Sequence, residues 1–237
     1  MQEFIGDGIL LADSKLVLFG APKSFKSILA MQMALTASAG SGWLGFPPST
    51  KPLRCYFIQG EIPRVAFRNR LVKMSGNCLP APNVLFTKTD FKLRLDTMAA
   101  FQTLEREIQQ IRPDILFLDP LYKLLSTQDD ITMARFFDNL DHMIEKYSLS
   151  VVIVAHDRKP QVDDRGRVLN LGGADLRGPR TLEGWFETII RLDGNISTDQ
   201  RVLSFEMRHG ETSIPPLPVN LDRSKLWMVK RIQERGE

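Results

Sequence analysis

The chain has 237 residues, 43% of them hydrophobic, and a formal net charge of +3. This length and apolar content predict one sizeable domain over residues 1–237, and the mild basic excess does not by itself establish a nucleic-acid partner. No apolar run approaches the ~20 residues of a membrane span, the N-terminus lacks a secretory-signal pattern, and the two cysteines form no disulfide framework. We therefore expect a soluble, cytoplasmic protein with no membrane partner.

From residue 15 onward, short apolar runs alternate with longer segments of helical pattern. Continuous apolar strands separated by helices are typical of a parallel sheet covered on both faces. Gly40 is suited to end the first helix, and Asp96 or Thr97 to cap the third. The predicted strands and the helices that follow them are 15–20 with 26–40, 54–60 with 63–76, 83–88 with 96–111, and 114–120 with 131–148, before a strand at 150–157.

The C-terminal part of the chain departs from this alternation. Strand patterns at 186–192, 200–208 and 226–232 are joined by turns, which predicts an antiparallel extension. The predicted fold class is therefore α/β, with a mainly parallel central sheet flanked by helices and a C-terminal antiparallel extension. The longest loops are expected at 42–52 and 157–180.

Residues 20–27, GAPKSFKS, follow the first predicted strand and open the first predicted helix. This is the context of a P-loop, G-x-x-x-x-G-K-[ST], in which backbone N–H groups at a helix N-terminus surround phosphate oxygens. Lys26 is placed to balance phosphate charge, and the Ser27 hydroxyl to hold Mg²⁺. The pattern predicts a site for ATP and Mg²⁺ that is made by Gly20, Ala21, Pro22, Lys23, Ser24, Phe25, Lys26 and Ser27.

Phe25 departs from the P-loop pattern because it occupies the place of the second glycine. A bulky residue that keeps the positive φ of that glycine incurs roughly 1 to 2 kcal/mol of strain, which is small beside the affinity of a nucleotide. The Phe25 ring could cover an adjacent apolar surface or the base of the nucleotide. A purely structural glycine turn is the alternative to a nucleotide site.

Two acidic residues follow buried strands further along the chain. Asp119 ends the apolar run in DILFLDP, the arrangement called Walker B, and is expected to orient Mg²⁺ or its water. Glu61 follows the strand in FIQGEIP, where its carboxylate is placed to polarise an attacking water. Because the helix dipole also favours an acid at a helix start, a structural role for Glu61 remains open.

The order of these motifs, from the P-loop through Glu61 and Asp119 to VVIVAHD and a basic loop, resembles that of the RecA-like P-loop ATPases. Over roughly residues 10–230 the chain is similar to RepA-type plasmid helicases and to the ATPase domain of hexameric replicative helicases. The resemblance implies that Glu61 is the catalytic base and that Asp119 supports the metal. It also implies that His156 senses the γ-phosphate, with a histidine hydrogen-bonded at a strand end as the structural alternative.

The segment SFEMRHGETSIPPLPVNLD resembles the helicase hairpin whose lysine and arginine reach the nucleotide of the neighbouring subunit. Arg208 matches the arginine, whereas Glu206 stands where the lysine is expected. The resemblance therefore implies a catalytic role for Arg208 in trans, with Arg177 or Arg180 as substitutes. A solvated hairpin arginine is the alternative for Arg208.

The resemblance also implies that two loops, at roughly 121–132 and 157–176, face the DNA channel of a ring. The later loop lacks aromatic residues, which favours contacts with the phosphate backbone over base stacking. A merely solvated loop is the alternative, because acidic residues offset its positive charge. These are Asp157, Asp163, Asp164 and Asp175. The candidate DNA-binding residues are Arg158, Lys159, Arg165 and Arg167.

These inferences together predict a Mg²⁺-dependent ATPase that acts in DNA replication or repair. We expect a ring-forming helicase or helicase-loader-like protein on single-stranded DNA, a homo-oligomer with a hexamer favoured, and replication proteins as partners. The chain lacks the separate N-terminal domain of replicative helicases, which favours a loader or accessory ATPase. The alternatives are a non-hydrolysing nucleotide-binding scaffold or regulator and a P-loop small-molecule kinase, and Glu61 and Arg208 argue against the kinase.

Overall fold

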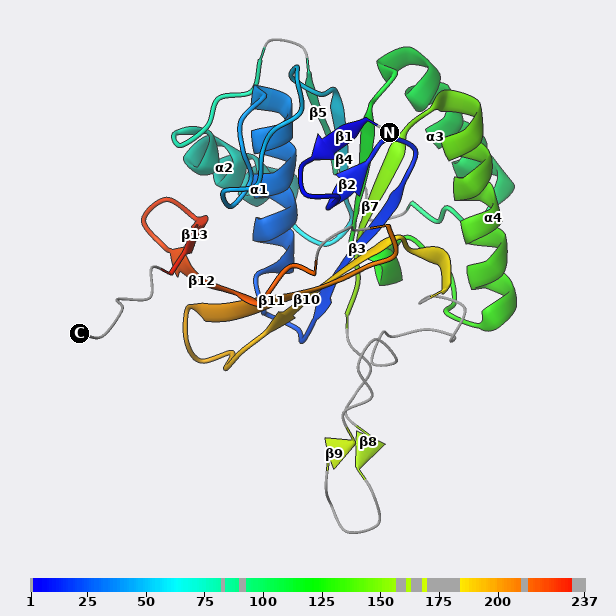
Figure 1. The fold of residues 1–237 in the computed structure, drawn as a ribbon. Coiled ribbons are helices and arrows are strands. Elements are labelled where there is room, and N and C mark those ends of the chain that lie inside the picture. Colours follow the sequence, from blue (N-terminus) through cyan, green and yellow to red (C-terminus); the bar gives the residue numbers. More distant parts are fainter. Residues whose placement is uncertain are drawn as a thin grey trace, which may run out of the picture.

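A nine-stranded sheet runs through the molecule (Figure 1). The computed structural model describes residues 2–81, 84–89, 93–156, 161–162, 168–169, 184–209 and 213–231. In spatial order the strands of the sheet are β13 (Trp227–Lys230), β12 (Leu217–Asp222), β11 (Gln200–Met207), β10 (Thr188–Asp193), β3 (Lys15–Gly20), β7 (Ser150–Val154), β6 (Ile115–Asp119), β4 (Cys55–Gln59) and β5 (Leu85–Thr89).

The strands from β10 to β5 are parallel to one another, and those from β10 to β13 are paired antiparallel. Every residue of β4, β6 and β7 is buried, as expected for parallel strands with helices on both faces. The predicted α/β class, with a mainly parallel sheet and an antiparallel extension at the C-terminal end, is confirmed.

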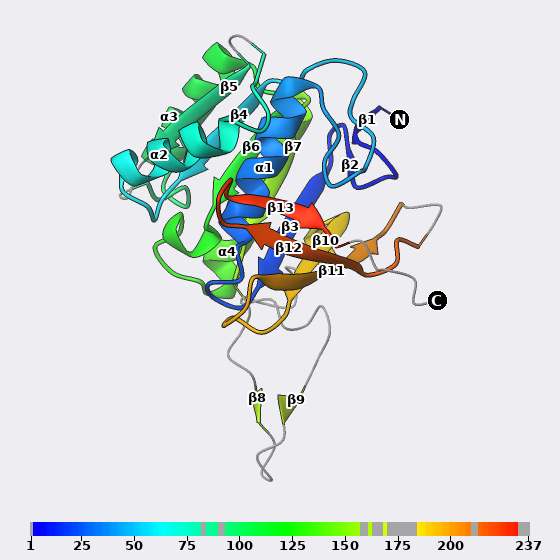
Figure 2. The same ribbon diagram turned by 90° about the vertical axis from the view of Figure 1, so that its left-hand side faces the viewer.

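Helices α1 (Lys26–Ala39) and α2 (Arg64–Ser75) cover one face of the sheet, and α3 (Met98–Ile111) and α4 (Asp130–Tyr147) cover the other (Figures 1 and 2). Alternate residues of a strand therefore enter different cores. Phe57 of β4 packs on the side of α1 and α2, whereas Ile58 packs on the side of α3 and α4.

The central helix α1 is buried on nearly all sides because the β12–β13 hairpin also packs against it (Figure 2). The side chain of Gln32 donates to the carbonyl of Met228 at 3.0 Å and accepts from its N–H at 2.8 Å. This pair of hydrogen bonds satisfies a buried amide and fixes the C-terminal hairpin to the helix that follows the P-loop.

The helix ends follow the expected cap residues. Gly40 ends α1 with a φ of 66°, a left-handed conformation that glycine adopts without strain. The cap of α3 is Thr97, whose side chain accepts from the N–H of Ala100, while Asp96 accepts from the N–H of Ser126 instead. Among the described residues, no helix has both the length and the apolar character needed to cross a bilayer.

Several elements differ from the expectation. The segment expected to begin the antiparallel extension, β10, is parallel to β3, so the change of direction falls between β10 and β11. Strand β12 was missed because Pro218 lies within it and lacks a backbone donor. The short N-terminal pair β1 (Glu3–Ile5) and β2 (Leu10–Leu11) was also missed, since two or three residues give no readable period.

The two segments expected to face DNA are only partly open loops. Residues 121–123 form the short helix η1 (Leu121–Lys123), and α4 has already begun at Asp130. Within the later segment, β8 (Gln161–Val162) pairs antiparallel with β9 (Val168–Leu169). The four basic residues proposed for DNA binding lie outside the described residues: Arg158, Lys159, Arg165 and Arg167.

Candidate functional site

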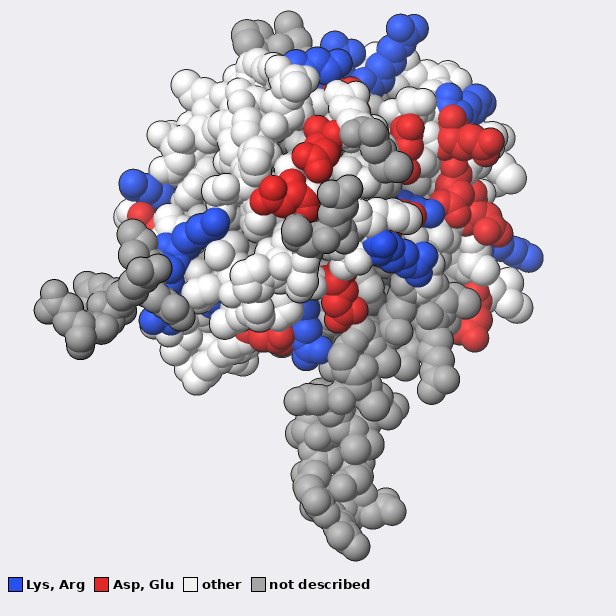
Figure 3. All heavy atoms as spheres, in the orientation of Figure 1, with Lys and Arg blue, Asp and Glu red and all other residues white. Residues whose placement is uncertain are grey.

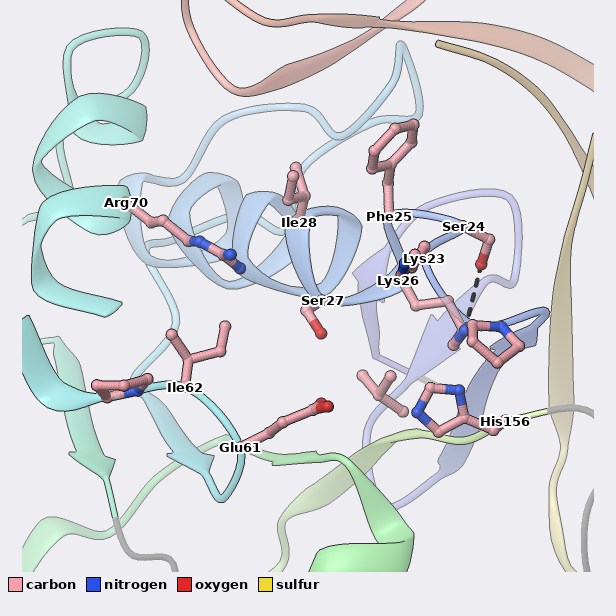
Figure 4. A pocket seen from close by; sticks show the side chains of 13 residues that line it. Lys23, Ser24, Phe25, Lys26, Ser27, Ile28, Glu61, Ile62, Arg70 and His156 are labelled. Carbon is pink, nitrogen blue, oxygen red and sulfur yellow. Dashed lines mark hydrogen bonds between the residues drawn. The ribbon is translucent and has the colours of Figure 1, made fainter. Parts of the chain in front are cut away.

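A cavity of about 530 Å³ opens at the carboxyl end of the parallel strands, beside the N-terminus of α1 (Figure 4). Its walls come from the P-loop (residues 20–27), the segment between β4 and α2, and the end of β7. These segments are far apart in sequence but adjacent here because parallel strands end at the same edge of the sheet. Clefts at this edge are the usual ligand sites of open α/β sheets.

The P-loop begins with a glycine that no other residue could replace without movement of the backbone. Gly20 has a φ of 150°, and a Cβ placed on it would meet the carbonyl oxygen of Leu192 at 2.5 Å. Phe25 has a φ of 73° and a ψ of 17°, so it keeps the left-handed conformation of the glycine that it replaces. Its ring is half-buried against the core that contains α1, as one of the sequence interpretations expected.

Lys26 is the most enclosed cation of the loop, with 4% of its surface exposed. Its amino group donates to the carbonyls of Gly20 at 2.8 Å and Ala21 at 2.7 Å, and to the Ser24 hydroxyl at 3.2 Å (Figure 4). The first turn of α1 has no acidic residue to neutralise the amide groups of its N-terminus. A lysine beside free helix amides is the arrangement that binds phosphate.

Ser27 and Asp119 meet at the floor of the site. The Ser27 hydroxyl donates to Asp119 Oδ1 at 3.0 Å, and Asp119 Oδ2 is buried without a hydrogen-bond partner among the described residues. Burial, and then the nearby carboxylate of Glu61, raises the pKa of Asp119 to about 7, although Ser27, Lys26 and Arg70 oppose the shift. A buried carboxylate with an open oxygen beside a serine hydroxyl fits a Mg²⁺ site.

Glu61 and His156 approach the same space from the ends of β4 and β7, which lie on either side of β6. In Figure 4 both side chains point toward the region in front of Ser27. Glu61 is exposed, and its Oε1 accepts a hydrogen bond from the hydroxyl of Tyr122 at 3.0 Å. The rings of Tyr122 and His156 meet edge to face with centroids 5.2 Å apart. The structure thus brings the predicted base and the predicted sensor together through a tyrosine that the sequence interpretation did not select.

Three further residues of the site were not selected from the sequence. Arg70 of α2 lines the cavity and points toward the start of α1 (Figure 4). Gln59 lies beside Asp119 in register, is 1% exposed, and has no hydrogen-bond partner for its amide among the described residues. Arg201 of β11 lies behind the P-loop with 1% of its surface exposed. An arginine at an inward position of a strand was the available signal for Arg201.

Arg208 does not join the other predicted site residues. Its neighbour Met207 pairs with Thr188, which pairs with Leu16 near the start of β3, so Arg208 lies toward the opposite edge of the sheet from the P-loop. Its guanidinium donates to the carbonyl of Gly184 at 2.7 Å. The substitutes considered for it, Arg177 and Arg180, lie outside the described residues.

One face of the described part of the molecule has no uniform charge. Figure 3 shows acidic and basic side chains interspersed over one face of the described part of the molecule. No broad basic patch dominates the described part of this face.

Comparisons with known proteins show the family and the fold of the chain. A model of the AAA domain family matches residues 2–162, whereas no curated protein matches the sequence. The RadB recombinase has a similar structure, with a TM-score of 0.64 and 13% sequence identity over 93% of this chain and 92% of its own. The KaiC-like protein PH0186 of the hyperthermophilic archaeon Pyrococcus horikoshii OT3 gives a TM-score of 0.65 and 11% identity over 98% of this chain and 100% of its own. These structural matches show the fold, and the RecA-like fold expected from the sequence is confirmed.

Proposed function

Because the chain belongs to the AAA domain family and has the fold of the RecA-like P-loop ATPases, we propose that it is a Mg²⁺-dependent ATPase acting on single-stranded DNA in replication or repair. The observation that carries the ATPase assignment is that Lys26, Ser27 and Glu61 line one cavity beside a helix N-terminus. The buried Asp119 joins them through its hydrogen bond from the Ser27 hydroxyl.

Nucleotide binding falls to the P-loop in this proposal. The amides at the start of α1 surround the β- and γ-phosphates, and Lys26 exchanges its carbonyl partners at Gly20 and Ala21 for phosphate oxygens. Ser27 and Asp119 would hold Mg²⁺. When bound, Mg²⁺ neutralises the charge that develops on the transferred phosphoryl group.

Hydrolysis falls to Glu61, which removes the proton from the attacking water as it approaches the γ-phosphate. Tyr122 orients Glu61 through the 3.0 Å hydrogen bond, and His156 reports the state of the γ-phosphate through its ring contact with Tyr122. Arg70 adds positive charge on the α2 side of the cavity. Glu61, held by Tyr122, is placed to activate water rather than to assist transfer of the phosphoryl group to a second small molecule. This disfavours the kinase alternative.

The ring assignment depends on Arg208. Arg208 lies toward the edge of the sheet away from its own P-loop. In the proposed ring it would exchange its hydrogen bond to the Gly184 carbonyl for the nucleotide of a neighbouring subunit, where an arginine supplied in trans stabilises the transition state. We propose a homo-oligomer of single RecA-like domains over residues 1–237, with a hexamer favoured, that works as a helicase or as a helicase loader with replication proteins in the cytoplasm.

The DNA assignment depends on the loop that contains Arg158, Lys159, Arg165 and Arg167. One protein of similar structure is named a recombinase, which supports a role on DNA. We expect single-stranded DNA to stimulate hydrolysis more than duplex DNA or RNA does. Replacing Arg165 and Arg167 by Ala should remove most of the stimulation and reduce its salt dependence, while hydrolysis without DNA is retained. Equal stimulation of the variant and the wild-type protein would contradict the assignment.

Calorimetry with ATP and Mg²⁺ tests the nucleotide site directly. Lys26→Ala should abolish detectable binding because it removes the cation at the phosphates, whereas the matched control Lys51→Ala, at an exposed loop position, should bind as the wild-type protein does. Wild-type affinity in Lys26→Ala would remove the basis of the assignment.

A nucleotide-binding regulator that does not hydrolyse ATP is the second candidate. The observation that favours it is the exposure of Glu61, whose carboxylate is held by Tyr122 rather than enclosed over the P-loop. A phosphate-release assay with Lys26→Ala as the blank separates the two candidates. Binding without release above the blank, with and without DNA, supports the regulator.

A further inference from the structure

Arg201 occupies a position in β11 where the strand pattern calls for an apolar residue. Leu203 and Phe205, two and four residues later, pack into the core that contains α1, and Arg201 lies on the same face of the strand. The side chain is nevertheless 1% exposed. A buried guanidinium is unfavourable unless its donors are satisfied, so the partners of Arg201 show why it is tolerated there.

One side of the Arg201 guanidinium holds the turn between β10 and β11. Its Nη1 donates to the carbonyls of Asn195 at 2.9 Å, Thr198 at 2.9 Å and Gln200 at 2.6 Å. These bonds fix the guanidinium relative to the turn, and the remaining donors are directed at the P-loop.

The other side of Arg201 contacts the P-loop in three ways. Its Nε donates to the carbonyl of Ser24 at 3.3 Å, its Nη2 donates to the carbonyl of Lys23 at 3.4 Å, and its guanidinium carbon lies 4.5 Å from the centre of the Phe25 ring. Lys23 and Phe25 are the two residues of the loop other than glycine with positive φ, at 65° and 73°. Arg201 thus contacts the two strained positions of the loop and the residue between them.

The direction of these bonds matters for the anion site. The carbonyl of Ser24 and the N–H of Phe25 belong to the same peptide bond, and in a trans peptide these two groups point in opposite directions. Because the carbonyl points toward Arg201, the N–H of Phe25 points away from it. That N–H is one of the loop amides that open α1, where phosphate binds.

We propose that Arg201 is a positioning residue that, together with the Phe25 ring, replaces the missing second glycine of the P-loop. Glycine would take the left-handed conformation without support. Here the guanidinium holds two carbonyls and the ring, and thereby keeps the loop in the shape that receives phosphate. The inference deepens the proposed function, because the phosphate that it serves is that of the bound nucleotide.

Amide hydrogen exchange in the protein without nucleotide tests the loop directly. Arg201→Lys keeps the charge but loses the fork of donors, and it should speed exchange at residues 23–26 about tenfold while strand β6 keeps its protection. The control is Arg54→Lys, because Arg54 also donates to a main-chain carbonyl, that of Ile111, but at the other end of the sheet. Phe25→Leu, which removes only the ring, should shift exchange in the same direction by a smaller factor.

Exchange that is unchanged at residues 23–26, or raised there only as much as in β6, would overturn the inference, since Arg201 would then stabilise the fold and not the loop. This experiment needs no nucleotide, so it decides the role of Arg201 even if the proposed function is wrong. Wild-type protein that fails to bind ADP at all would overturn the proposed function alone.

Calorimetry with ADP tests the pairing of Arg201 with Phe25. In the protein that keeps Phe25, Arg201→Lys should weaken ADP binding about tenfold. In the protein that also carries Phe25→Gly the loss should be only about twofold to threefold, because glycine takes the left-handed conformation without a contact between a ring and Arg201. Equal losses in the two backgrounds would overturn the pairing. A larger loss with Phe25→Gly would do the same.

Discussion

Asp119 should make the stability of the protein depend on pH in the direction opposite to that of an ordinary ion-paired carboxylate. Burial raises its pKa from 3.8 to about 7. Below pH ~4 Asp119 is protonated in both the folded and the unfolded chain. Between pH ~4 and ~7 only the unfolded chain releases the proton, so the free energy of unfolding falls as the pH rises through this window.

The magnitude follows from the pKa difference. A pKa shift from 3.8 to about 7 lowers the free energy of unfolding by at most about 4 kcal/mol, and the full loss is reached above pH ~7. Asp119→Asn removes the buried charge and retains an oxygen for the Ser27 hydroxyl, which donates to Asp119 at 3.0 Å. The new amide nitrogen is itself buried, which offsets part of this effect. We therefore expect the free energy of unfolding of Asp119→Asn to exceed that of wild type by about 1 to 3 kcal/mol at pH 8.

Thermal melting of the protein without nucleotide, from pH 5 to pH 8.5, measures this effect. For a chain of this length, 1 kcal/mol corresponds to roughly 2 to 4 °C in Tm, so Asp119→Asn should melt several degrees above wild type at pH 8 and lose the advantage toward pH 5. Mg²⁺ with ATP should stabilise the wild-type protein more than Asp119→Asn, which loses a metal ligand but keeps Lys26 and the P-loop amides. The control is Asp13→Asn, because Asp13 is exposed. A Tm difference between Asp119→Asn and wild type that is constant across the whole pH range would refute the reasoning.

Three further predictions concern hydrolysis. Glu61→Gln should bind ATP normally but release phosphate at least ~100-fold more slowly, and turnover within a few-fold of wild type would leave Glu61 as a helix-start acid. Phe25→Gly should preserve or increase turnover, because glycine takes the φ of 73° without strain. A collapse of nucleotide binding would show instead that the ring is needed for its contact with the nucleotide or with the core. Mixing Lys26→Ala subunits with Arg208→Ala subunits should restore activity above either variant alone, since the effect of an arginine in trans is on the order of 10³-fold. Full activity of Arg208→Ala in a verified monomer would contradict the shared site.

The sequence was sufficient for the features that depend on neighbouring residues. The alternation of apolar runs with helical segments predicted the parallel sheet. Because cap chemistry is local, Gly40 was recognised as a helix end, and the cap of α3 was narrowed to Asp96 or Thr97, of which the structure has Thr97. The P-loop was found in the same way, since strand, turn and helix follow one another over residues 15–39. The proximity of Ser27 and Asp119 followed from a general property of parallel sheets, whose strands end at one edge.

Tertiary structure alone decided which side chains support that site. Arg201 reaches the carbonyl of Ser24 across 177 residues of sequence, and Tyr122 reaches Glu61 across 61. Neither contact has a local pattern, because each depends on the spatial order of the strands. That order places β10 between β3 and β11, and β6 beside β4. The sequence therefore determined that a phosphate loop is present, whereas packing of the C-terminal strands determined how a phenylalanine can stand in place of its second glycine.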